Sequence, residues 1–178
     1  MTTLRADAAR SRTRILEAAR ARPVGDLRLN DVAHDAGVGV ATVYRHFPTV
    51  HALTEALTAD TVERLLELSR NAAAEPDPSR AFTTYLQSVL DLQLDNEGLQ
   101  PVLLSPDDES EDVRAAKSEI FATSAAVLQR AQAAGAVRPD LTLERMQHLV
   151  CGIEHAVRLG SPGDREPLAA ILLAGLRP

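Results

Sequence analysis

The stretch from Arg28 to Phe47, RLNDVAHDAGVGVATVYRHF, constrains the fold of this chain more than any other. Its apolar residues recur at helical spacing on both sides of Gly37, and glycine enters positive φ without a Cβ clash. Small Ala33 allows a second helix to approach closely, and that helix carries Val43 and Phe47 four residues apart on one face. The stretch therefore predicts two short helices crossed at a tight turn, which is a helix-turn-helix.

The second of these helices carries polar side chains away from its apolar face. They are Thr42, Tyr44, Arg45 and His46. Hydroxyl, phenol, guanidinium and imidazole groups all donate hydrogen bonds to phosphate oxygens or base edges. The pattern therefore predicts a surface that contacts DNA. The alternative for Tyr44 is a core aromatic with its hydroxyl at the rim, and for His46 a solvated surface imidazole.

The motif GVGVATVYRHFPT, preceded by DVAHDAG and an arginine-rich amphipathic helix, resembles the TetR family of bacterial transcriptional regulators. The resemblance covers roughly the first third of the chain, where spacing, aromatic placement and flanking helices agree. It implies that Thr42 and Arg45 face the major groove and that the other contacts bind phosphates, partly through backbone N–H groups. The DNA-contacting positions that it implies are Arg28, Gly39, Val40, Thr42, Tyr44, Arg45 and His46.

The chain departs from the family pattern at several phosphate-binding positions. Many relatives carry a hydroxyl residue at the position of Arg28, Ser-Lys in place of Gly39 and Val40, and lysine in place of Val50. Arg28 can keep a phosphate contact but cannot cap the helix. Each lost contact makes the salt dependence of binding shallower by about one unit. The departures leave a second hypothesis open, a dimeric helical interaction module with weak or lost DNA binding.

Charge and composition fit a regulator of this kind. The chain has 178 residues and a net charge of −6, but residues 1–22 are basic and acids dominate after residue 60. A basic end on an acidic body is typical of a DNA-binding head with a separate body, although arginines also serve simply to solvate an exposed helix. The lone Cys151, the lack of an apolar run of about 18 residues and the lack of a signal peptide predict a cytoplasmic protein without a membrane span.

Abundant alanine and leucine with few aromatic residues predict an all-α fold of about nine helices. Apolar periodicity places these helices at residues 8–21, 29–36, 41–47, 50–73, 79–97, 101–104, 111–134, 141–159 and 164–176. Residues 2–9 are expected to fray, Ser79 to cap the fifth helix, Gly98 to end it, and residues 106–112 to form an exposed acidic loop. We expect a DNA-binding domain at residues 1–50 and a ligand-binding and dimerisation domain at residues 51–178.

The resemblance implies that the body binds a small-molecule effector and that the protein is a homodimer that represses from a near-palindromic operator. The candidate effector residues are Leu65, Phe82, Tyr85, Leu86, Val89, Ile120, Phe121 and Ser124. The candidate dimer residues, on the last two helices, are Met146, Leu149, Val150, Ile153, Val157, Leu168, Ile171, Leu172 and Gly175. The alternative for both sets is ordinary core packing within one chain.

An enzyme has little support in the sequence. Asp31, His34, Asp35, His46 and His51 lie near one another along the chain, but no His-x-x-x-His, cysteine pair, Gly-rich phosphate loop or Gly-x-Ser-x-Gly occurs. His148, Cys151 and His155 lie on one predicted helix, with the two histidines two turns apart and too distant to share a metal from one helix. We therefore expect no catalysis, no cofactor and no metal, with metal sensing through these three residues as the alternative.

Overall fold

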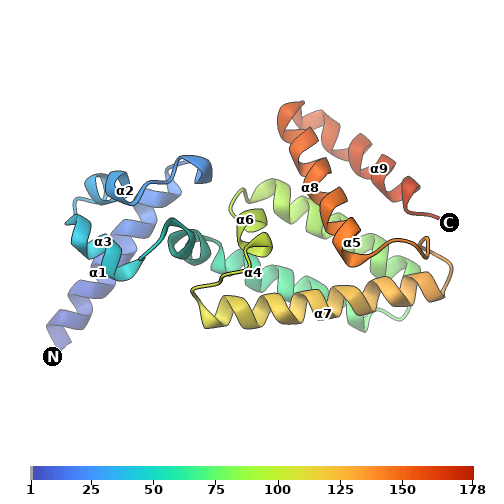
Figure 1. Cartoon of the computed structure of the whole chain (residues 1–178), viewed down its shortest axis with the longest axis horizontal. Coiled ribbons are helices and arrows are strands. Elements are labelled where there is room, and N and C mark those ends of the chain that lie inside the picture. The colour runs from blue at the N-terminus through green and yellow to red at the C-terminus, as the bar shows by residue number, and fades with distance from the viewer. Residues whose placement is uncertain (1) are drawn as a thin grey trace. The chain divides into compact units, whose positions relative to one another are not determined.

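A computed structural model describes residues 2–178, and the side chains of all of these except residues 2–5 and 162. The regular structure in this part of the chain is helical throughout (Figure 1), which confirms the all-α prediction. Its α-helices are α1 (Thr2–Arg20), α2 (Leu29–Asp35), α3 (Val40–His46), α4 (Val50–Ala74), α5 (Pro78–Asp95), α6 (Leu99–Leu104), α7 (Glu111–Ala133), α8 (Leu143–Leu159) and α9 (Arg165–Gly175). Two short 3₁₀-helices, η1 (Val24–Asp26) and η2 (Pro162–Asp164), precede α2 and α9.

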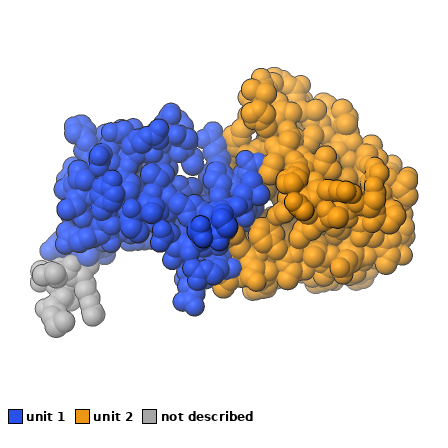
Figure 2. Space-filling model, viewed as in Figure 1, with its two compact units in different colours: residues 1–60, 97–114 blue, residues 61–96, 115–178 orange. Residues whose placement is uncertain are grey.

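The chain forms two compact units (Figure 2). The first contains residues 1–60 and 97–114, and the second contains residues 61–96 and 115–178. These units differ from a division at residue 50 because the first part of α4, α6 and the loop after α6 all belong to the first unit. The functional division into residues 1–50 and 51–178 stays a prediction.

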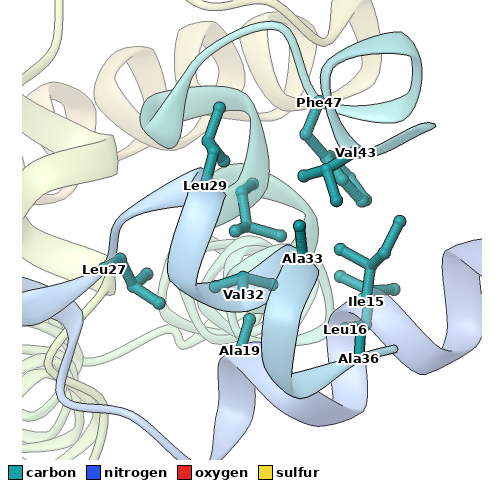
Figure 3. Close-up of a cluster of buried hydrophobic side chains, with 11 residues drawn as sticks. Ile15, Leu16, Ala19, Leu27, Leu29, Val32, Ala33, Ala36, Val43 and Phe47 are labelled. Atoms are coloured by element: carbon teal, nitrogen blue, oxygen red, sulfur yellow. The ribbon is translucent and has the colours of Figure 1, made fainter. Parts of the chain in front are cut away.

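The core of the first unit is apolar and is built from α1, α2, α3 and the start of α4 (Figure 3). Its buried members are Ile15, Leu16, Ala19, Leu27, Leu29, Val32, Ala33, Ala36, Val43, Phe47 and Leu53. Full burial of a valine, leucine, isoleucine or phenylalanine side chain contributes about 1.5–3 kcal/mol to the stability of the folded chain. Leu27 and Leu29 fix the loop between α1 and α2 to this core.

The start of α1 differs from the prediction. Helix α1 begins at Thr2, so residues 2–9 are helical where the sequence predicts fraying. Alanine and arginine are strong helix formers, and Arg10 pairs with Asp7 one turn earlier. The arginine-rich segment is therefore one continuous helix.

Two predicted features of α5 were wrong. Asp77, and not Ser79, caps the helix: its carboxylate accepts hydrogen bonds from the backbone N–H groups of Ser79 and Arg80. Pro78 occupies the first helical position, where no N–H is needed. The helix ends at Asp95, so Gly98 belongs to the start of α6, where a Cβ would lie 2.6 Å from Thr58 Cγ2 of α4.

Polar contacts and helix packing hold the second unit together. Arg130 of α7 donates to the backbone oxygens of Ala73 and Glu75, and Arg165 of α9 pairs with Asp91 and Asp95 of α5. Helices α8 and α9 pack against each other and against α5. Among the described residues, no helix combines the length and the hydropathy that a membrane crossing requires.

Candidate nucleic-acid interface

The turn between α2 and α3 depends on Gly37. This residue has a φ of +59°, the left-handed conformation that glycine adopts most readily. The Gly37 N–H donates to His34 O and the Val38 N–H donates to Ala33 O, each at 3.0 Å. These two bonds satisfy the last carbonyls of α2 and form a Schellman motif. The predicted turn is confirmed, and it sets the angle at which α3 leaves α2.

Helix α3 is held to the core by one face. Val43 is fully buried and Phe47 is 3% exposed, and both lie in the apolar cluster with Ile15 (Figure 3). The assignment of Val43 and Phe47 to the core is confirmed. Because these two side chains point inward, the opposite face of a short helix must point outward.

The outward face of α3 carries Val40, Ala41, Tyr44 and Arg45. Val40 is 46% exposed and Tyr44 is 47% exposed, so Tyr44 is not a core aromatic. Thr42 and His46 flank this face and are half-buried. Ala41 is absent from the sequence-predicted contacts, although its spacing of four residues from Arg45 places it on the same face.

Arg45 and Thr42 interact with each other on α3. The guanidinium Nη2 of Arg45 donates to Thr42 Oγ1 at 3.2 Å. This bond uses one of the five guanidinium N–H groups, so four remain for a partner outside the protein. The hydroxyl of Thr42 therefore orients the longest side chain on the exposed face.

Arg28 occupies the N-cap position of α2 without capping it, as the sequence predicts. Its Nη1 donates instead to the carbonyl oxygens of Leu27, at 2.9 Å, and Gly25, at 3.5 Å. These contacts hold the guanidinium near its own loop. The predicted phosphate contact of Arg28 stays a prediction.

Three arginines of the basic N-terminal segment, two on α1 and Arg22 just after it, make contacts inside the first unit that the charge pattern did not reveal. Arg14 donates to Gly37 O at 3.2 Å, and Arg22 donates to Asp35 Oδ2 at 2.7 Å. The guanidinium of Arg12 lies 5.4 Å from the centre of the Phe47 ring. The bond from Arg22 is the main reason why the pKa of Asp35 lies below its ordinary value, and His34 contributes in the same direction. The basic segment therefore stabilises the turn as well as adding positive charge.

The predicted effector residues fill the interior of the second unit. Most of them are buried, while Val89 and Phe121 are half-buried. The Tyr85 hydroxyl lies 2.7 Å from Ser124 Oγ, which donates to Ile120 O, and burial raises the pKa of Tyr85. Their polar groups are thus paired within the chain. None of the eight predicted residues lines the hollow between α5 and α9, which includes Leu90, Asp91 and Arg165.

The predicted dimer residues divide by burial. Met146, Val150 and Leu172 are buried within the single chain, and Ile153, Val157 and Leu168 are half-buried. Leu149 is 42% exposed, Ile171 is 66% exposed, and Gly175 is exposed. The exposed members line a hollow between α8 and α9 together with Ile153. The single chain therefore leaves large apolar side chains of both α8 and α9 exposed.

The residues of the alternative metal hypothesis do not form a ligand group. Within the described chain, His148 and His155 are exposed on α8 and the three residues are not gathered around one point. The group of ligand atoms that does come together consists of His51, Glu55 and Asp108.

Comparisons with known proteins place this chain in a family. A model of TetR C-terminal domains, described as "Transcriptional regulator SbtR-like, C-terminal domain", matches residues 77–178. A TetR transcription regulatory protein from Mycobacterium vanbaalenii is 31% identical, with a TM-score of 0.50, over 98% of this chain and 99% of that chain. A TetR transcriptional regulator from Streptomyces coelicolor is also 31% identical, with a TM-score of 0.53, over 94% of this chain and 98% of that chain.

A more distant structure shares the fold alone. The transcriptional regulator FadR from Bacillus subtilis, in complex with stearoyl-CoA, is 13% identical, with a TM-score of 0.58, over 93% of this chain and 99% of that chain. No curated protein matches the chain significantly. Since a family model covers more than half of the chain and relatives 31% identical span nearly all of it, the chain belongs to the TetR family of transcriptional regulators.

Proposed function

We propose that this protein is a DNA-binding repressor that binds a near-palindromic operator as a homodimer and is released by a small molecule. The observation that carries the proposal is the exposed face of α3, where Tyr44 and Arg45 face away from a core anchored by Val43 and Phe47. Family membership adds the expectation that such a helix enters the major groove.

Direct base readout is assigned to Arg45 and Thr42, since a guanidinium reads guanine and a hydroxyl reads several bases. Tyr44 and His46 then bind phosphates, as do Arg28 and the backbone N–H groups at Gly39 and Val40. The exposed methyl groups of Val40 and Ala41 are suited to contact thymine methyls. Together these groups supply phosphate contacts, which position the protein on DNA, and base contacts, which give sequence specificity.

The Arg45→Ala variant tests the assignment of base readout. Loss of one good guanidinium contact should weaken operator binding by about 1–3 kcal/mol, which is roughly 5- to 160-fold, and relax sequence preference. Fluorescence anisotropy with the DNA upstream of the protein's own gene, and with random DNA of equal length, measures both effects. Arg64→Ala, an exposed arginine of the second unit, is the matched control and should leave both affinities unchanged.

Equal losses on operator and random DNA would show that Arg45 binds phosphate instead of bases. If the unmodified protein binds neither DNA at any salt concentration, the repressor proposal fails and the interaction module takes its place. The exposed apolar side chains of Val40 and Val50, at positions where many relatives carry lysine, give that alternative its physical basis.

We propose that the homodimer forms through α8 and α9. Leu149 and Ile171 are large apolar side chains left exposed by the single chain, and the hollow beside them also contains Ile153 and Gly175. Exposed apolar surface of this kind on two adjacent helices marks a protein–protein interface. The buried Met146, Val150 and Leu172 support the surface from beneath.

The effector is assigned to the second unit, most of which lies within residues 77–178, where the family model matches. For effector binding to release DNA, the effector must bind more tightly to the conformation that does not bind DNA. FadR binds stearoyl-CoA in its own structure, but a likeness of fold does not carry that ligand to this chain. If no tested small molecule changes the affinity of the protein for its operator, the proposal that an effector releases the protein from DNA fails.

A further inference from the structure

His51, Glu55 and Asp108 meet in the first unit from two separate elements. His51 and Glu55 lie one turn apart on α4, while Asp108 belongs to the loop that joins α6 to α7. The His51 Nε2 atom lies 3.0 Å from Glu55 Oε1 and 3.9 Å from Asp108 Oδ1. One ligand atom from each residue lies within 4.8 Å of the other two.

The three side chains are shielded from solvent to different degrees. The side chain of Glu55 is 2% exposed, that of Asp108 is 5% exposed and that of His51 is 25% exposed. The prediction of an exposed acidic loop is therefore wrong at the side chain of Asp108. Buried carboxylates are costly unless a cation or several hydrogen-bond donors compensate them.

The ring nitrogen of His51 lacks a hydrogen bond in this arrangement. Its Nε2 atom is buried and has no hydrogen-bond partner, although Glu55 Oε1 lies 3.0 Å away. A buried polar atom left unsatisfied costs about 1–3 kcal/mol. A cation that accepts the nitrogen lone pair and both carboxylates would remove this cost.

Backbone contacts hold Glu55 in place for such a role. Its Oε1 accepts the Glu109 N–H and its Oε2 accepts the Ser110 N–H, both at 2.9 Å. Each carboxylate oxygen keeps a second lone pair. Hydrogen bonds from outside the ligand set orient metal ligands in this way. They also fix the loop that carries Asp108 against α4.

We propose that His51 Nε2, Glu55 and Asp108 form a zinc-binding site with one coordination position open to water. Imidazole nitrogen and carboxylate oxygen are both ordinary zinc ligands, at about 2.0–2.2 Å from the metal. Tetrahedral ligands at that distance lie about 3.3–3.6 Å from each other. The observed separations of 3.0 and 3.9 Å bracket this value. Mg²⁺ prefers an octahedral set of oxygens and is a poor match.

Isothermal titration of the full-length protein tests the site. The protein is stripped of metal with a chelator, exchanged into a buffer that does not bind zinc, and titrated with ZnCl₂ or, separately, MgCl₂. We expect one zinc ion per chain, no heat of binding from magnesium, and a higher Tm with zinc because zinc binds only the folded site.

Two variants remove one ligand each. His51→Ala and Asp108→Asn should each weaken zinc binding by more than about 10-fold, since even indirect support of a ligand is worth 10- to 100-fold. The matched control is His34→Ala, an exposed histidine of the same unit, which should bind zinc as the unmodified protein does. Circular dichroism verifies that each variant is folded, and the two ligand variants lie on different elements, so one remains informative if the other unfolds.

Three results would overturn the site. They are an unmodified protein that takes up no zinc, ligand variants that bind it as tightly as the unmodified protein, and zinc binding that disappears in Cys151→Ser but not in His51→Ala. The last result would move the metal to α8. The test does not involve DNA, so its outcome is independent of the proposed repressor function.

Discussion

At the scale of single residues, Gly37 has the largest effect on the site. It combines a positive φ, an N–H that donates to His34 O in the turn and a carbonyl that accepts from Arg14. A Cβ at this position would lie 2.7 Å from Arg14 Nη2. The end of an arginine side chain can move, so the larger cost of a substitution is backbone strain.

We expect Gly37→Ala to lower the free energy of unfolding by about 1–2 kcal/mol, the cost of the left-handed conformation for a residue with a Cβ. Urea denaturation followed by circular dichroism measures this change. Gly25→Ala is the control, because Gly25 has no positive φ and no atom would lie within 4 Å of its Cβ. Equal losses in the two variants would show that the turn does not require glycine.

At the scale of elements, the contact between Arg22 and Asp35 links the segment that follows α1 to the end of α2. Both guanidinium nitrogens that approach the carboxylate lie within 2.7 Å of Asp35 Oδ2. The contact lowers the pKa of Asp35 in the folded protein, so the carboxylate binds its proton less readily there than in the unfolded chain. Stability from this contact is therefore present above the ordinary pKa of 3.8 and is lost as pH falls through the lowered value.

The Arg22→Gln variant should consequently have a lower Tm than the unmodified protein at pH 7, and the difference should shrink below the ordinary Asp35 pKa of 3.8. Thermal denaturation across this pH range measures the effect, which is small because the pair is partly exposed. In an Asp35→Asn background, Arg22→Gln should give a difference that does not vary with pH. A pH-dependent difference in that background would assign the effect to another acid, such as nearby Asp31.

The elements differ in how far the sequence predicts them. Helices α2 and α3 follow from local features, namely Gly37 and the four-residue spacing of Val43 and Phe47. The prediction was wrong at both ends of α5. At its start, Asp77 and Ser79 are both good N-caps in sequence, and only the hydrogen bonds that the Asp77 carboxylate accepts from backbone N–H groups distinguish them. Periodicity gives the apolar stripe of α8, but burial of Met146 and exposure of Leu149 depend on neighbouring helices.

At the scale of the whole molecule, the proposed dimer gives a test that the single chain allows. Leu149→Glu combined with Ile171→Glu places two charges on the exposed surface of α8 and α9. We expect the dimer to weaken by at least about tenfold, or 1.4 kcal/mol, because buried charges without partners oppose association. Analytical ultracentrifugation over a range of concentrations measures the dissociation constant.

Leu104→Glu is the matched control for this experiment. Leu104 is 53% exposed on α6, so the substitution adds a charge at an exposed leucine of the first unit, while α8 and α9 belong to the second. The control should dimerise normally. If the double variant also dimerises normally, the assignment of the dimer to Leu149 and Ile171 is wrong.

The sequence by itself determined the helix-turn-helix, because its turn, its inward face and its polar outward face depend on residues within about twenty positions of each other. Only the tertiary structure decided that Arg14 and Arg22 stabilise the head from within, and that Asp108 joins His51 and Glu55. The physical reason is that such contacts join side chains from different elements, and spacing along the chain carries no information about which loop returns to which helix.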